Sequence, residues 1–172
     1  MNNSNGLQIL KPIVLDTADL KMLLPHRDLA IGILDEAFYN PTKNANELIA
    51  FKKTVPDDPY FIGHYPGNPV LPGHWQYEAM CLASALLFKQ LHFGLIGNPA
   101  IVGTDGKMRF QRPVFPGDDL TIHSELIGDR IIPGKGAHYY FSTCIKRGTE
   151  KISFIEKLIG SFFPEKILEV IK

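Results

Sequence analysis

Apolar side chains near the N-terminus recur with the spacing of a helix. Three leucines fall on one helical face: Leu20, Leu23 and Leu24. Asp16 or Thr17 can cap this helix, and Pro25 ends it. We therefore expect a short helix over residues 16–24, after a loose lead-in over residues 1–15.

A long apolar segment in the middle of the chain predicts a second, longer helix. It begins near His74, runs to about Phe93 and ends at Gly94, and its apolar residues cover nearly the whole helical circumference. A helix that is apolar all round belongs inside a fold. Its longest apolar run, residues 79–88, is well short of the roughly 20 residues that a membrane span needs.

Strand-like alternation occurs on both sides of this long helix. Residues 30–39 and 47–55 precede it, separated by Asn40-Pro41. Four longer segments follow it, joined in part by glycine-containing turns, at residues 103–114, 119–127, 137–146 and 153–163. Because the long helix is the element able to cover the sheet's apolar face, we expect one α+β domain over residues 1–172, with an antiparallel sheet around a central helix.

Composition and charge narrow the class of protein. The 172 residues include 18 Lys and Arg against 18 Asp and Glu, which argues against a nucleic-acid-coating protein. Cys81 and Cys144 have no Cys or His at metal-ligand spacing, so we expect two reduced thiols. Residues 1–6 lack the features of a signal peptide. We therefore expect a cytoplasmic protein that does not enter membranes.

The segment before the long helix is unusually rich in proline and glycine. Residues 56–73 hold five prolines and three glycines, which restrict the backbone to one path. His64 lies in this stiff loop, close to the helix start, where it suits a preorganised site. From local chemistry alone, the favoured alternative is a rigid crossover between strand and helix, with His64 merely packed.

Glu78 is the one acidic residue of the predicted long helix. Burial would raise the pKa of its carboxyl, whereas the helix N-terminus would favour the anion, and the sequence does not decide between them. Glu78 is either a functional acid or an exposed residue that stabilises the helix dipole. His74 lies four residues earlier, so a contact between the two is expected. The spacing of His64, His74 and Glu78 matches no recognised zinc signature, so we expect no metal.

Three motifs point to a known family. The first motif is Leu23-Leu24-Pro25-His26-Arg27. The second is the loop from Phe61-Ile62-Gly63-His64-Tyr65-Pro66-Gly67 to Pro72-Gly73, followed on the helix by Glu78-Ala79-Met80. The third is Arg109-Phe110-Gln111-Arg112-Pro113, followed by Pro116-Gly117-Asp118. In this order they closely resemble the β-hydroxyacyl-acyl-carrier-protein dehydratases, nearest the FabZ type. The resemblance covers roughly residues 20–163. It implies a hot-dog fold, a sheet wrapped around a long helix, and no metal, nucleotide or flavin cofactor.

The resemblance also implies the reaction and its main residues. The family pairs a His of the loop with an acid of the helix, here His64 and Glu78, and draws the two from different subunits. The implied reaction converts a 3-hydroxyacyl thioester on acyl carrier protein to the trans-2-enoyl thioester. His64 would remove the C2 proton, and Glu78 would protonate the departing hydroxyl. A homodimer or a trimer of dimers follows from this pairing.

Further residues complete the expected site. The backbone N–H of Gly73, at the helix N-terminus, is the expected donor to the thioester oxygen. The other expected substrate contacts are Val70, Pro72 and Leu82. A basic group near one strand consists of Lys107, Arg109 and Arg112. It is either a solvated strand face or a patch that steers an acidic carrier protein to the site.

Two other functions stay open. One is a hot-dog thioesterase, in which a carboxylate activates water against the same thioester, although the loop resembles the dehydratases far better. The other is a non-catalytic acyl-thioester-binding protein, against which the intact His64 and Glu78 argue. The chain departs from the family pattern after Gly73, where His74, Trp75 and Gln76 follow, and at Leu82, which replaces a Gln. Both departures are expected near the acyl tunnel or the catalytic water. These departures leave chain length and pathway open.

Overall fold

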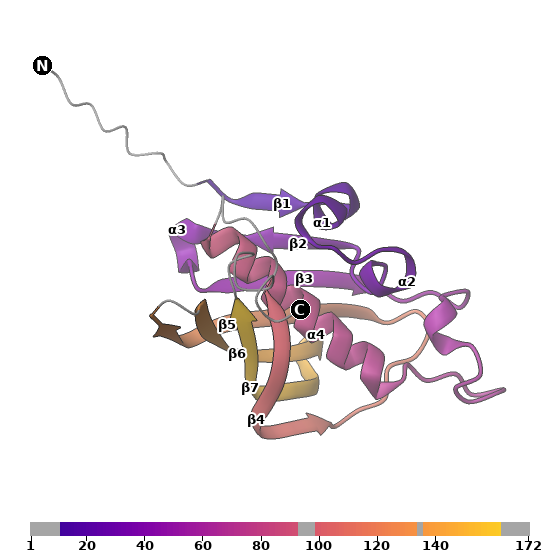
Figure 1. The fold of residues 1–172 in the computed structure, drawn as a ribbon. Helices are drawn as coiled ribbons and strands as arrows, with labels where there is room; N and C mark the ends of the chain where they lie inside the picture. The colour runs from indigo at the N-terminus through magenta and orange to yellow at the C-terminus, as the bar shows by residue number, and fades with distance from the viewer. Residues whose placement is uncertain (1–10, 93–98, 134–135, 163–172) are drawn as a thin grey trace, which may run out of the picture.

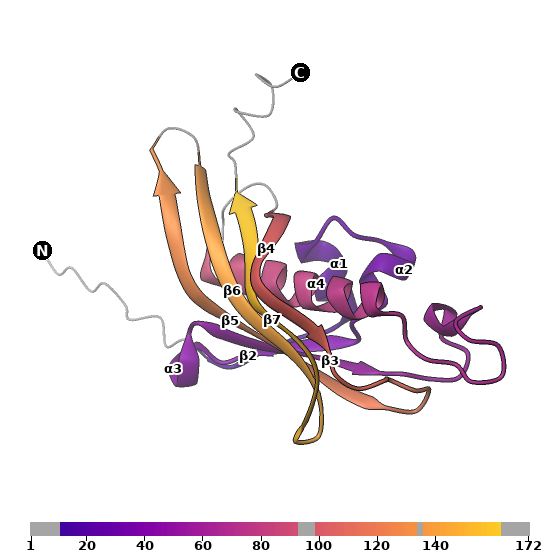
Figure 2. The same ribbon diagram turned by 90° about the horizontal axis from the view of Figure 1, so that it is seen from below.

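A computed structural model describes residues 11–92, 99–133 and 136–162. Its described strands form one seven-stranded antiparallel sheet in the order β1-β2-β3-β5-β6-β7-β4 (Figure 1). The strands are β1 Ile13–Leu15, β2 Glu36–Tyr39, β3 Glu47–Lys53, β4 Ala100–Phe110, β5 Asp119–Ile132, β6 Gly136–Arg147 and β7 Glu150–Phe162. The sheet curls, and the long helix α4, Gly73–Leu91, lies in its concave side (Figure 2). This confirms the predicted α+β architecture.

The helix α4 fills the centre of the core. Every residue from Ala79 to Phe88 is buried, and the side chains of Leu86, Leu87 and Phe88 are fully enclosed. The inward faces of β5 and β6 cover it with alternate residues, such as Ile122 and Phe141. Since apolar residues surround this helix on all sides, its sequence shows no amphipathic stripe. The predicted end near Phe93 and Gly94 lies outside the described residues.

The N-terminal helix forms as predicted. It is α1, Thr17–Leu23, and Asp16 caps it by accepting hydrogen bonds from the backbone N–H groups of Ala18 and Asp19 at 2.8 and 3.0 Å. The Asp19 carboxylate accepts from the Asp16 N–H at 3.1 Å, which completes a capping box. The lead-in before it is not loose throughout, because β1 pairs with β2. Residues 1–10 lie outside the described range.

The strand predicted over residues 30–39 is wrong in its first half. A single turn of helix, α2 Asp28–Ile31, occupies that position, and β2 begins at Glu36. Ile31, Ile33 and Leu34 are all buried, a pattern that no half-buried strand produces. Asn40 and the proline after it, predicted as a simple break, instead cap and start another one-turn helix, α3 Pro41–Asn44.

The strand β4 lies at the edge of the sheet. It pairs with β7, and no other described strand pairs with its second side. A bulge between Asp105 and Met108 places Gly106 at φ +81°, where the Glu156 side chain packs against it. The Val102 and Phe110 side chains on this edge are 56% and 47% exposed. An unpaired edge with exposed apolar side chains is suited to pairing with another chain.

Candidate active site

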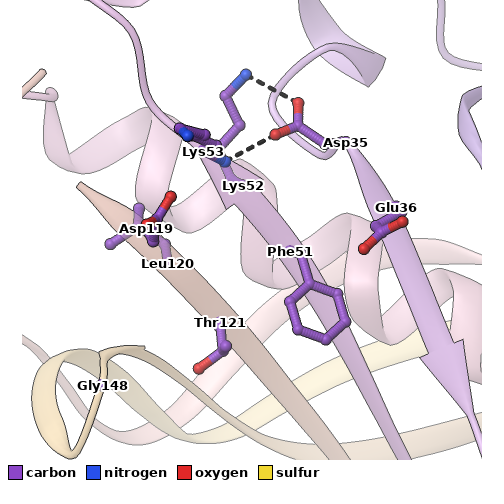
Figure 3. A pocket seen from close by; sticks show the side chains of 9 residues that line it. All are labelled: Asp35, Glu36, Phe51, Lys52, Lys53, Asp119, Leu120, Thr121 and Gly148. Atoms are coloured by element: carbon purple, nitrogen blue, oxygen red, sulfur yellow. Dashed lines mark hydrogen bonds and ion pairs between the residues drawn. The ribbon is translucent and has the colours of Figure 1, made fainter. Parts of the chain in front are cut away.

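A buried lysine holds the base of the proline-rich loop. The Lys52 ammonium on β3 lies 3.1 Å from the Asp35 carboxylate and 3.5 Å from the Asp58 carboxylate. Figure 3 shows this ammonium and the backbone N–H of Lys53 against Asp35. Asp58 also accepts a hydrogen bond from the Val55 N–H at 2.8 Å. These contacts tie the start of the loop to two neighbouring strands.

His64 is fixed by the loop's own backbone. Its Nδ1 lies 2.8 Å from the Val70 carbonyl oxygen, and the Val70 N–H donates to the His64 carbonyl at 2.9 Å. Because a carbonyl oxygen can only accept, Nδ1 carries the proton and Nε2 is the free basic nitrogen. Gly63 and Gly67 both have φ +79°, a left-handed conformation that glycine adopts without strain, and they turn the chain on either side of His64. The imidazole is thereby held in one orientation, in which Nε2 is the nitrogen able to take up a proton.

A cavity of about 320 Å³ adjoins His64. Its wall includes four of the residues that the sequence nominated: His64, Val70, Gly73 and Arg112. Pro72 and Leu82 are not in that wall, because Pro72 is the buried N-cap of α4 and the 1% exposed Leu82 packs in the core. Phe110 and Gln76 also line the cavity; sequence reasoning assigned Phe110 no site role and singled out Gln76 only as a departure from the family pattern. Both residues stand within or beside the motifs quoted above, and this position was the available sign in the sequence that they belong to the site.

The N-terminus of α4 opens onto this cavity at Gly73. The helix begins there, and its N-cap Pro72 makes no side-chain capping hydrogen bond. The first backbone N–H groups of a helix have no carbonyl partner within it, so they can serve an anion or a polarised oxygen. A Cβ at Gly73 would lie 3.1 Å from ring atoms of Phe110. Glycine therefore lets this ring lie close against the helix start.

Glu78 does not contact His64 within one chain. Its carboxylate lies 3.8 Å from His26 Nε2, and the two side chains are 31% and 36% exposed. The predicted contact with His74 does not form, because the His74 ring lies against Trp75 with a centroid distance of 5.2 Å. Sequence reasoning missed His26 as the partner of Glu78, although it stands in a quoted motif. The Glu78 carboxylate is therefore not part of the wall of the His64 cavity.

Two groups beside Glu78 stay protonated near neutral pH. Burial raises the pKa of the Cys81 thiol to about 12, and the nearby Glu78 charge acts in the same direction. Burial also raises the pKa of the Tyr77 hydroxyl to about 12, with further contributions from Cys81 and Glu78. A thiol needs its thiolate form to act as a nucleophile. Cys81 is therefore a packing residue, and both cysteines are free.

The three residues of the basic group, Lys107, Arg109 and Arg112, have different surroundings. Lys107 and Arg109 are exposed on β4. The guanidinium of Arg112 lies 3.1 Å from the Glu150 carboxylate, which reduces its charge toward solvent. Among the described residues, no three His, Cys, Asp or Glu side chains gather as a metal site. No described helix is long and apolar enough to cross a membrane.

Comparison with known proteins identifies the family. A sheet wrapped around a buried helix, with a histidine cavity at the helix start, defines a hot-dog domain of the acyl-thioester type. A sequence model of the FabA-like domain matches residues 24–152, and the chain belongs to this family.

Two curated relatives carry the same name. The 3-hydroxyacyl-[acyl-carrier-protein] dehydratase FabZ of Acidovorax sp. (strain JS42) is 35% identical over 137 residues, 78% of this chain and 88% of the relative. The FabZ of Thermus thermophilus is 33% identical over 144 residues, 82% of this chain and 96% of the relative.

Solved structures give weaker matches. A hypothetical thioesterase with coenzyme A from Streptococcus pneumoniae TIGR4 has a TM-score of 0.48 at 14% identity, covering 70% of this chain and 81% of that one. The dehydratase heterocomplex ApeI:P from Xenorhabdus doucetiae has a TM-score of 0.44 at 18% identity, covering 69% and 89%.

Proposed function

We propose that the protein dehydrates 3-hydroxyacyl thioesters on acyl carrier protein to trans-2-enoyl thioesters, in fatty-acid biosynthesis or a related pathway. Membership of the FabA-like family and the FabZ relatives support this hydro-lyase activity over thioester hydrolysis. The observation that carries it is the fixed imidazole of His64, with Nε2 free, in a cavity at the start of α4. The protein acts in the cytoplasm, in keeping with its two free thiols.

The base and the oxyanion donor come from one chain. His64 Nε2 removes the C2 proton of the substrate, while Nδ1 stays bonded to the Val70 carbonyl. Negative charge then develops on the thioester oxygen, where the Gly73 N–H at the helix N-terminus stabilises it. One such donor typically lowers the barrier by about 3–4 kcal/mol. Proton transfer and electrostatic stabilisation suffice for this reaction, so no cofactor is part of the proposal.

The acid comes from a second copy of the chain. Glu78 is not part of the wall of its own chain's His64 cavity, and Phe110 belongs both to that wall and to the open edge of β4. Two copies that pair along β4 form a homodimer in which Glu78 of the partner subunit supplies the proton to the leaving hydroxyl. A trimer of such dimers uses the same pairing. The exposed Lys107 and Arg109 on the same strand meet the acidic carrier protein.

A spectroscopic assay tests the activity itself. Purified protein is presented with 3-hydroxyacyl and trans-2-enoyl thioesters on carrier protein, and hydration, dehydration and thiol release are followed together. We expect interconversion of the two thioesters without release of thiol. Thiol release would instead identify a thioesterase. Binding with neither reaction, across several chain lengths, would identify a non-catalytic acyl-binding protein.

A further inference from the structure

Gln76 is a buried polar residue in the wall of the His64 cavity. Its side chain is 3% exposed, although glutamine is usually a surface residue. It lies in the first turn of α4, three residues after Gly73. Gln76 is neither the base, the acid nor the oxyanion donor of the proposed reaction.

The orientation of its amide is fixed, and it leaves one atom without a partner. Nε2 donates a hydrogen bond to the Leu71 carbonyl oxygen at 3.3 Å, whereas Oε1 is buried with no hydrogen bond. A flipped amide would place Oε1 against the Leu71 carbonyl, which has no hydrogen to donate, so the observed orientation is the favourable one. A buried acceptor left unpaired destabilises the fold, so it calls for an explanation.

The helix places Gln76 and Glu78 on opposite sides. Residues two positions apart in an α-helix point about 200° apart around the axis. Gln76 lines the cavity of its own chain, while Glu78 faces outward to His26. In the proposed dimer, a substrate in the cavity meets His64 and Gln76 of one chain, and Glu78 of the partner subunit approaches it from the second copy.

We propose that Gln76 Oε1 accepts a hydrogen bond from the 3-hydroxyl of the substrate, which makes Gln76 a specificity-determining residue for 3-hydroxyacyl thioesters. This inference rests on the proposed dehydratase function. When the hydroxyl hydrogen points to Oε1, a lone pair of the hydroxyl oxygen is directed to the acid. The substrate then satisfies the one unpaired atom of the Gln76 amide.

The proposed elimination of water conserves atoms, electrons and protons. The C2–H electrons form the C2=C3 bond as the proton passes to His64 Nε2, and the C3–O bond breaks. The departing oxygen takes a proton from the carboxyl of Glu78 of the partner subunit and leaves as water, which keeps its hydrogen bond to Gln76. His64 has gained one proton and the carboxyl has lost one, so exchange with solvent restores both groups.

Ligand binding separates this role from a structural one. The test uses protein carrying His64→Ala, which slows turnover about 10²- to 10⁴-fold, and pairs of 3-hydroxyacyl and saturated acyl pantetheines of equal chain length. We expect the hydroxylated ligand to bind about 5- to 30-fold more tightly. Adding Gln76→Leu should abolish that difference and leave the saturated ligand's Kd unchanged. The matched control Gln90→Leu, the same change near the other end of α4, should retain it.

Three results would overturn the inference. They are a preference that persists with Gln76→Leu, an equal loss of both ligands, or no preference in the His64→Ala protein at any length. An equal loss would mean that Gln76 only supports the cavity or meets the pantetheine arm. Failure of the dehydratase function is seen separately, as a wild-type protein that does not interconvert the thioesters, whatever the binding data show.

Discussion

His64 carries the first proton transfer of the proposed reaction. Replacing it with alanine removes the base but leaves the loop's backbone contacts and the N-cap of α4 in place. We expect His64→Ala to lower kcat by about 10²- to 10⁴-fold. Steady-state kinetics measure the loss, and circular dichroism with thermal unfolding checks that the fold is kept. A variant that retained near-normal turnover would remove His64 from the mechanism.

Cys81 gives a test of burial at the level of one thiol. Its pKa of about 12 means that almost no thiolate exists at pH 8 in the folded protein. We expect alkylation of Cys81 in the native protein to be far slower than in urea-unfolded protein, followed by mass spectrometry of the modified peptide. Rapid native alkylation would show that the α4 environment is more open than its contacts indicate.

His123 links stability to pH. Burial is the main reason that its pKa lies below the usual value, Lys146 lowers it further, and Glu47 at 3.6 Å opposes both. Unfolded His titrates near 6.5. As pH falls below about 6.5, the unfolded chain therefore takes up the proton first, and the free energy of unfolding decreases. Above that pH the contribution is fully present.

The measurement is urea unfolding of the wild type and His123→Gln at pH 7.5 and 5.5. The wild type should lose stability between these pH values, and the variant should lose less. Equal losses in both proteins would assign the pH dependence to other groups, among them His92, whose pKa burial also lowers.

The sequence was enough to identify the main candidate residues of the site, but not to predict their contacts. Motif and residue chemistry singled out His64 and Glu78. Which atoms they contact depends on chain segments that are far apart in sequence, and the pairing of Glu78 with His26 could not be read from spacing. The unpaired atom of Gln76 is likewise a property of packing, because the sequence shows only a glutamine near a helix start.

Among the elements, the loop that carries His64 depends on Lys52. This ammonium is 7% exposed and bridges Asp35 to the nearly buried Asp58. Lys52→Met leaves the Asp58 carboxylate buried without its cation, so we expect the free energy of unfolding to fall by about 3 kcal/mol. Chemical denaturation measures the change.

The adjacent Lys53 supplies the control for this prediction. Its side chain is exposed, and its contact with Asp35 uses the backbone N–H, which substitution preserves. Lys53→Met should change stability by less than about 0.5 kcal/mol. If both variants lost the same stability, the buried ion cluster would not be what holds the loop.

The elements that the sequence predicted are the ones long enough to show a period. The helix α4 and the strands β5, β6 and β7 extend over many residues, and each was found, with ends shifted by pairing. In contrast, β1 has three residues and α2 has four, too few to establish either period. Their conformation is set by β-sheet pairing and by burial of Ile31, which are tertiary effects.

At the scale of the whole molecule, the proposed site needs residues from two chains. His64 and Gly73 line one cavity, while Glu78 lies near His26 and is not part of the cavity wall. The family resemblance predicts that His64 and Glu78 act from different subunits, and this stays a prediction. The β4 edge, with Val102 and Phe110 exposed, is where a second copy would complete the site.

Mixing two inactive variants tests this two-chain dehydratase site most directly. His64→Ala and Glu78→Gln proteins are unfolded together and refolded, and enoyl thioester formation is followed by absorbance. A mixed dimer has one site with both groups intact, so the mixture should recover about a quarter of the wild-type activity, whereas each variant alone stays inactive. A mixture as inactive as its components, although mass spectrometry shows mixed dimers, would contradict catalysis by His64 and Glu78 from different chains.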